Sequence, residues 1–150
     1  MNIFIILSVI FAVIILNFGI IAYLFSVMKK RLDTVVREDL SRETILMKSY
    51  YANFFGQESR GFSQIRGNGI LVLTENFLYF QMLVPRKKLI IPVSSMTGTQ
   101  IVRTFLAKTK FRPLLKVSFH TDEGNDSAAW LLKDPHSWKE RLDEMIQYCK

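Results

Sequence analysis

The side chains that could act as nucleophiles, general bases or metal ligands are few. The chain has two histidines, His120 and His136, and one cysteine, Cys149. Nucleophilic catalysis needs a serine or cysteine beside a base, and neither histidine lies in a local catalytic motif. One cysteine and two histidines without close spacing do not make a zinc site. We therefore expect no catalytic centre, no metal site and no cofactor.

Two further motifs are better explained as turns. The acidic residues Asp122, Glu123 and Asp126 surround Gly124, but an EF-hand calcium site needs a longer ligand loop, so a hairpin turn is the simpler interpretation. The run GNG (67–69) precedes a strand-like segment. It is therefore neither a dinucleotide fingerprint nor a phosphate-binding loop, both of which open a helix. These motifs leave the prediction of a non-enzyme unchanged.

Basic residues are concentrated in the middle of the chain. The 150 residues include 20 Lys+Arg and 13 Asp+Glu, a net charge of +7. Residues 51–112 hold nine of these basic residues and two of the acidic ones, so an anionic partner is expected to meet this block. The candidate contact residues come from two predicted loops: Arg86, Lys87, Lys88, Arg103, Lys108, Lys110 and Arg112.

These loop cations have two interpretations. They either contact anionic lipid headgroups or serve only as solvated surface charge. No nucleic-acid-binding motif accompanies them, so nucleic acid is not an expected partner.

The N-terminal segment predicts a transmembrane helix. Residues 1–28 contain no Asp, Glu, Lys, Arg or His, and a helix of this length exceeds the roughly 30 Å hydrocarbon core of a bilayer. A soluble core helix would show a polar face, which is missing here. A signal peptide would carry basic residues before its apolar run, whereas here they follow it. We therefore predict an uncleaved single-pass anchor.

The residues after the span predict the topology. Lys29, Lys30 and Arg31 follow it directly, and the positive-inside rule places this flank in the cytoplasm. The N-terminus then lies outside the cell membrane and the C-terminal domain lies in the cytoplasm. The single cysteine, which cannot form an internal disulfide, fits a reducing compartment.

Residues 29–44 predict a helical linker, because they contain neither Pro nor Gly. Its apolar residues Leu32, Val35, Val36 and Leu40 lie near one stripe. The stripe could pair with a second copy of the chain, lie on the headgroups or cover the following domain.

Residues 45–150 predict a domain of mainly β structure with one C-terminal α-helix. Seven apolar runs read as strands over 46–55, 69–74, 77–84, 88–93, 99–106, 114–121 and 127–132. Their spacing is too tight for crossover helices, so an antiparallel sheet is expected. The helix is expected over 134–150, with Asp134 as N-cap and Pro135 in the first turn. Its apolar stripe, which should cover the sheet, consists of Trp138, Leu142, Met145, Ile146 and Cys149.

Four segments in this order resemble a known superfamily. They are GNGILVLTENFLYF (67–80), the basic turn PRKK (85–88), the run LIIPVSSM (89–96) and the terminal helix with Trp138. Residues 45–148 resemble a pleckstrin-homology-like domain of the GRAM type. The resemblance implies a bent seven-stranded sheet or partial barrel capped by the helix, and the binding of lipids or proteins without catalysis. Arg60 and Arg66 lie scattered in the first hairpin, so a strict phosphoinositide signature is missing.

The sequence thus favours a membrane-anchored, non-catalytic binding module that contacts an anionic membrane surface. The alternative is a protein-interaction or self-association scaffold that uses the domain and the linker stripe.

Overall fold

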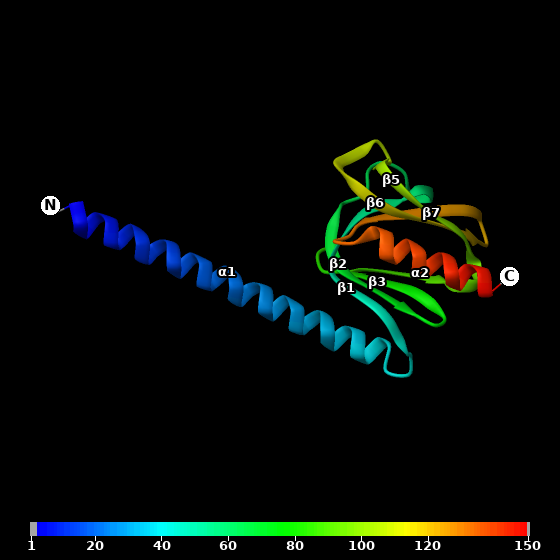
Figure 1. The fold of residues 1–150 in the computed structure, drawn as a ribbon, viewed down its shortest axis with the longest axis horizontal. Coiled ribbons are helices and arrows are strands. Elements are labelled where there is room, and N and C mark those ends of the chain that lie inside the picture. The colour runs from blue at the N-terminus through cyan, green and yellow to red at the C-terminus, as the bar shows by residue number, and fades with distance from the viewer. Residues whose placement is uncertain (1–2, 150) are drawn as a thin grey trace. The chain divides into compact units, whose positions relative to one another are not determined.

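The computed structural model of the chain describes residues 3–149 (Figure 1). These residues form two compact units, with the boundary between Ser41 and Arg42. The first is a single helix, and the second, here called the β unit, contains all the strands and the second helix.

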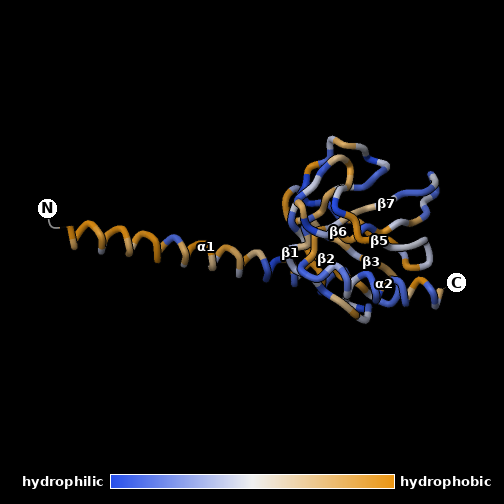
Figure 2. Tube along the Cα trace, turned by 45° about the horizontal axis from the view of Figure 1, so that its top comes forward, coloured by the Kyte–Doolittle hydropathy of each residue, from blue (hydrophilic) through white to orange (hydrophobic). Residues whose placement is uncertain are grey.

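Helix α1 (Ile3–Asp39) is long and apolar enough to cross a membrane. Its most apolar stretch has a mean hydropathy of 2.9, and Figure 2 shows hydrophobic residues along most of its length. The Asn17 amide donates to the Val13 carbonyl at 2.7 Å and the Ser8 hydroxyl to the Ile5 carbonyl at 3.0 Å. Both polar groups are thus satisfied within the helix. The helix is compatible with a membrane anchor and also with a signal sequence.

Helix α1 continues well past its apolar stretch. It includes the basic flank 29–31 and the stripe residues Leu32, Val35 and Val36. Leu40 follows the helix, and its backbone N–H donates to the Val36 carbonyl at 2.8 Å. The predicted linker is therefore helical only as far as Asp39, and residues 40–44 connect the helix to strand β1, which begins at Ile45.

The β unit is built on one seven-stranded antiparallel sheet, as the sequence predicts. The strands are β1 (Ile45–Gln57), β2 (Gly67–Thr74), β3 (Phe77–Met82), β4 (Lys87–Pro92), β5 (Met96–Phe105), β6 (Lys108–Thr121) and β7 (Gly124–Leu131). Two short 3₁₀ helices, η1 (Glu58–Arg60) and η2 (Val93–Ser95), follow β1 and β4. The order across the sheet is β4-β3-β2-β1-β7-β6-β5, so the mainly β fold class is confirmed.

Alternation along β1 supplies two hydrophobic clusters. Phe54 belongs to the main core, where its ring lies 5.2 Å from that of Phe80 and 5.8 Å from that of Trp130. Its neighbour Phe55 faces the other side and packs in a smaller cluster with Phe105. Every member of both clusters belongs to the β unit. This unit therefore has a hydrophobic core of its own.

Helix α2 (Pro135–Tyr148) packs against β5 and β6. Its N-cap is Asp134, which accepts hydrogen bonds from the Ser137 backbone N–H at 3.2 Å and hydroxyl at 2.6 Å. The stripe residues Trp138, Leu142 and Ile146 are buried and Met145 is half-buried. Cys149 is exposed, so its assignment to the stripe was wrong. It lies at the C-cap, beyond the last turn that faces the sheet.

Candidate functional site

Gln64 organises the loop between β1 and β2. Its side-chain amide donates to the carbonyls of Gln57 at 2.6 Å and Gly61 at 2.7 Å. Its side-chain oxygen accepts from the Gln57 backbone N–H at 3.0 Å. These hydrogen bonds connect the middle of the loop to Gln57, at the end of β1, and to Gly61. The conformation of the loop is therefore stabilised by its own polar groups.

Two lysines from different hairpins reach this same residue. The Lys87 ammonium, at the start of β4, lies 3.4 Å from the Gln64 side-chain oxygen. The Lys108 ammonium, at the start of β6, donates to the Gln64 carbonyl at 3.0 Å. The two basic loops singled out in the sequence therefore meet at a third loop, between β1 and β2, which contains none of the seven predicted contact residues.

Positive charge collects around Gln64. Burial, and after it the positive charge of Arg60, lower the pKa of the Lys87 ammonium. Within residues 3–149, Arg60, Lys87 and Lys108 form no ion pair. We call these three cations the Gln64 cluster. A group of unpaired cations, one of them partly desolvated, favours the binding of an anion beside it.

Two basic side chains of these loops form cation–π contacts with aromatic rings of the core clusters. The Lys87 ammonium lies 4.6 Å from the centroid of the Phe54 ring, and the Arg66 guanidinium 4.3 Å from that of Phe55. Cations attract the negative face of an aromatic ring. The side chains of these loops are thus positioned by the two core clusters, which fix where the positive charges lie.

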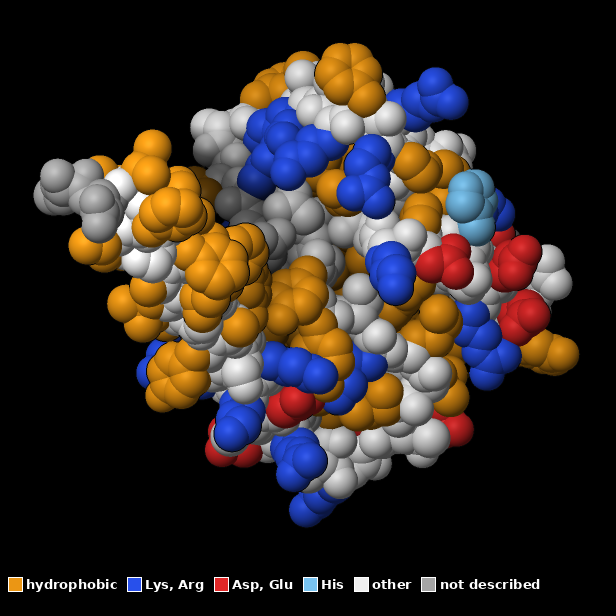
Figure 3. Space-filling model, turned by 60° about the vertical axis from the view of Figure 1, so that its left-hand side comes forward, with side chains coloured by type: hydrophobic (Ala, Val, Ile, Leu, Met, Phe, Trp, Pro, Cys, Tyr) orange, Lys and Arg blue, Asp and Glu red, His pale blue; other side chains and the backbone are white. Residues whose placement is uncertain are grey.

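The other predicted contact residues lie on the same two basic hairpins. Arg86 is exposed in the β3–β4 turn, and Arg103, Lys110 and Arg112 are exposed on the β5–β6 hairpin. Lys88 follows Lys87 along β4, so it points to the opposite face, where its ammonium lies 5.7 Å from the Tyr79 ring centroid. Of the seven predicted contact residues, Lys87 and Lys108 are joined through a shared partner, Gln64. Figure 3 shows Lys and Arg side chains gathered on one face of the β unit.

The β5–β6 hairpin differs from the expected one. Strand β6 begins at Lys108, six residues earlier than predicted, because Leu106 and Ala107 adopt left-handed backbone angles that close a two-residue turn. Pairing then passes from Thr104↔Thr109 to Val102↔Leu114. Residues 110–113 therefore bulge out of the ladder, and all four are exposed. We call this segment the 110–113 bulge.

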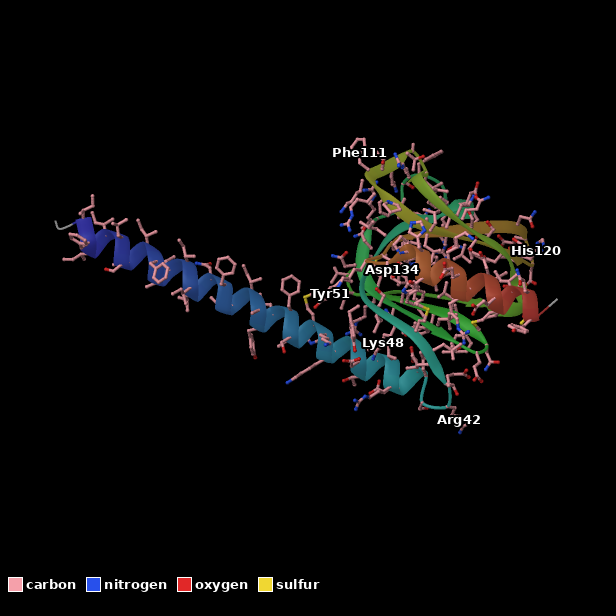
Figure 4. The ribbon with its side chains drawn as sticks, in the orientation of Figure 1. Arg42, Lys48, Tyr51, Phe111, His120 and Asp134 are labelled. Carbon is pink, nitrogen blue, oxygen red and sulfur yellow. The ribbon has the colours of Figure 1, made fainter. Side chains whose placement is uncertain are left out.

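The acidic residues of the last hairpin lie around one shallow pocket of about 320 Å³. Asp122, Glu123 and Asp126 line this pocket together with Arg60. Asp126 is the buried one of the three, and it accepts hydrogen bonds from the β1–β2 loop. Across residues 3–149, no three His, Cys, Asp or Glu side chains are placed to hold a metal ion. His120 lies exposed on β6 (Figure 4), where none of the described residues hydrogen-bonds to its ring.

Asp126 holds η1, and with it Arg60, in place. Its carboxylate accepts from the Gln57 amide at 2.6 Å, the Ser59 N–H at 2.9 Å, the Ser59 hydroxyl at 2.7 Å and the Ser127 N–H at 2.8 Å. Burial opposes its ionisation, but these hydrogen bonds outweigh burial and hold the pKa of Asp126 below its ordinary value. Stability from this group is therefore present at neutral pH and is lost as the pH falls through the lowered pKa.

We expect Asp126→Asn to lower the free energy of unfolding by about 2 kcal/mol at neutral pH, because hydrogen bonds to a buried charged acceptor are lost. The deficit relative to the parent should shrink in acid, because the parent loses this stability as the pH falls from the ordinary carboxyl pKa towards the lowered pKa of Asp126. Urea unfolding at neutral pH and at about pH 3 measures both. The control is Asp122→Asn, in an exposed turn; an equal deficit for the two variants would contradict this role of Asp126.

Comparison with known proteins gives similarity of fold alone. No family model matches the sequence, and no curated protein matches it. The C-terminal domain of an unknown protein from Leishmania infantum is similar at 17% identity and a TM-score of 0.55, covering 77% of this chain and 97% of that one. A chain of the 8S snRNP assembly intermediate is similar at 13% identity and a TM-score of 0.49, covering 70% and 80%.

Proposed function

We propose that this protein is a membrane-anchored, non-catalytic module whose β unit contacts an anionic lipid surface on the cytoplasmic side. The observation that carries the proposal is the Gln64 cluster, where loops far apart in sequence bring together three cations that form no ion pair within residues 3–149. We further propose that the β unit is a pleckstrin-homology-like domain of the GRAM type. Support comes from the order of its sequence motifs and from the seven antiparallel strands followed by a helix.

The proposal follows from the energetics of charge at a membrane. Each Lys or Arg near an anionic leaflet contributes about 1 kcal/mol of attraction. Lys87 is partly desolvated beside Arg60 within the protein, so phosphate oxygens approaching it would relieve an unfavourable interaction. An apolar helix such as α1 can provide attachment by itself. The cations would then set the orientation of the β unit at the surface.

The anchor makes a direct prediction about the mature protein. We expect the full chain to stay in the membrane pellet after alkaline carbonate washing, and its intact mass to include residues 1–28. A buried apolar span resists carbonate, whereas a removed signal sequence would release the β unit. A mature mass that begins after this segment would refute the anchor and leave a secreted domain.

The lipid contact can be tested on the full chain in vesicles. Exposed Ser63 in the β1–β2 loop is replaced by cysteine in a Cys149→Ser background, and the new thiol carries a fluorescence donor. Acceptors sit on the headgroups of phosphatidylcholine vesicles with or without phosphatidylglycerol. We expect more energy transfer when phosphatidylglycerol is present, and less as salt rises. Lys87→Gln with Lys108→Gln should lower the docking equilibrium roughly 30-fold, from about 2 kcal/mol of lost attraction.

The matched control removes the same net charge elsewhere. Lys139 and Arg141 lie on α2, where they pair with Asp143 and Glu144. Lys139→Gln with Arg141→Gln should leave energy transfer close to the parent value. Equal transfer in neutral and anionic vesicles, or equal loss in the two double variants, would exclude the Gln64 cluster as a lipid contact.

A further inference from the structure

Four large apolar side chains stand exposed on the three loops that carry the basic residues. Phe62 and Ile65 are 69% and 67% exposed in the β1–β2 loop, and Val84 is 79% exposed in the β3–β4 turn. Phe111 is 91% exposed in the 110–113 bulge. Exposed side chains of this size are unfavourable in water, so their presence on neighbouring loops indicates a contact surface.

Contacts between the loops place these four side chains around the Gln64 cluster. Phe62 and Ile65 flank Gln64 in sequence. The β3–β4 turn is held against the start of β2 by a 3.0 Å hydrogen bond from the Leu83 N–H to the Asn68 carbonyl. Phe111 lies three residues after Lys108, which itself donates to Gln64. Apolar and cationic side chains therefore alternate over one surface, which we call the loop face.

The backbone of the 110–113 bulge presents Phe111 outward. Phe111 has a left-handed φ of 55°, which is unusual for a residue other than glycine. Its backbone N–H donates to the Thr109 hydroxyl at 3.1 Å, and that hydroxyl donates to the Arg103 carbonyl at 2.9 Å. These bonds hold the conformation, and Figure 4 shows Phe111 at the outer end of the hairpin. Its sequence neighbours Lys110 and Arg112 are exposed beside it.

We infer that the loop face inserts into the bilayer, with Phe62, Ile65, Val84 and Phe111 below the headgroups and the surrounding cations among the phosphates. This inference rests on the proposed lipid contact and specifies how deeply the loop face enters the bilayer. The chemistry favours lipid over a protein partner, since the apolar side chains stand on separate loops between cations. Such a surface matches an interface in which anionic phosphates lie directly above hydrocarbon.

Tryptophan fluorescence tests the depth of Phe111 in the full chain. The two natural tryptophans, Trp130 and Trp138, are buried in the core. A tryptophan introduced by Phe111→Trp therefore adds a signal from the loop face. In vesicles containing phosphatidylglycerol and lipids brominated on their acyl chains, we expect this added emission to be quenched. The matched control is Tyr148→Trp, which introduces a tryptophan at a position 90% exposed on α2 and should not be quenched.

Polar substitution gives the second measurement. Phe62→Ser with Phe111→Ser should lower docking in the headgroup energy-transfer assay on the order of tenfold or more. Tyr148→Ser removes an equally exposed aromatic ring and should leave docking unchanged. Docking at parent level in the double variant, with no acyl-chain quenching at position 111, would overturn insertion while the proposed headgroup contact stands. Absence of docking by the parent in anionic vesicles would overturn both.

Discussion

Trp130→Ala should lower the free energy of unfolding of the β unit by about 3–5 kcal/mol. Trp130 is fully buried, and its ring lies 5.8 Å from that of Phe54 and 5.9 Å from that of Phe80. Truncation removes the dispersion contacts of the largest fully buried side chain and leaves a cavity between β1, β3 and β7. The loss is a large part of the 5–15 kcal/mol typical of a folded domain.

The effect should extend from the core to the loop face. The Phe54 ring contacts both the Trp130 ring and the Lys87 ammonium, so a shift of this ring weakens its cation–π contact with Lys87. The measurement is the loss of the sheet signal in circular dichroism as urea rises, with the full chain held in non-denaturing micelles. Docking to anionic vesicles should weaken in parallel.

Trp130→Phe is the control for size. Among residues 3–149, no group accepts a hydrogen bond from the Trp130 indole N–H, so the smaller ring loses volume but no such bond. We expect a cost of about 1–2 kcal/mol. If Trp130→Ala and Trp130→Phe lowered the free energy of unfolding equally, packing of the Trp130 ring could not be the source of its contribution to stability.

The elements of the fold could be predicted because their signals are local. The absence of charge over residues 1–28 indicates a long apolar helix, and the Asp134-Pro135 pair marks the start of α2. Alternation in residues 114–121 separates buried Leu115 and Val117 from the outer face. Each of these elements depends on residues that are close together in the sequence, so the sequence alone is enough to predict the element.

The candidate site could be predicted only in part, because it depends on contacts between distant residues. The basic residues of the two hairpins were visible, but only folding brings Lys87 and Lys108 to Gln64, 23 and 44 positions away. The position of Arg60 could not be predicted, because η1 is placed by hydrogen bonds that Ser59 donates to Asp126, far away in the sequence. The bulge at 110–113 arises from a register shift that composition does not mark. Apolar residues inside a polar, glycine-rich stretch, such as Phe62 and Ile65, were the signal available.

The glycines of the GNG run illustrate a motif whose reason appears only in three dimensions. Gly69 lies in β2 between β1 and β3, paired with Ala52 and Met82. A Cβ added there would lie 2.2 Å from the Gln81 carbonyl oxygen and 2.8 Å from the Phe80 ring. The first contact is with backbone, which cannot rotate away. The sheet must therefore separate locally to accept any side chain at this position.

We expect Gly69→Ala to lower the free energy of unfolding by about 3 kcal/mol or more, at the upper end of the cost of overpacking. The Phe80 ring packs against the rings of Phe54 and Trp130. Displacement of the Phe80 ring should therefore also alter the near-ultraviolet circular dichroism of the folded protein. Gly98→Ala in β5 is the matched control, because among residues 3–149 none beyond its two chain neighbours has an atom within 4 Å of the added Cβ. It should be neutral or slightly stabilising, by reducing the freedom of the unfolded chain. Similar unfolding midpoints for the two variants in urea would contradict the close approach of β2 and β3, and with it the position of the β3–β4 turn on the loop face.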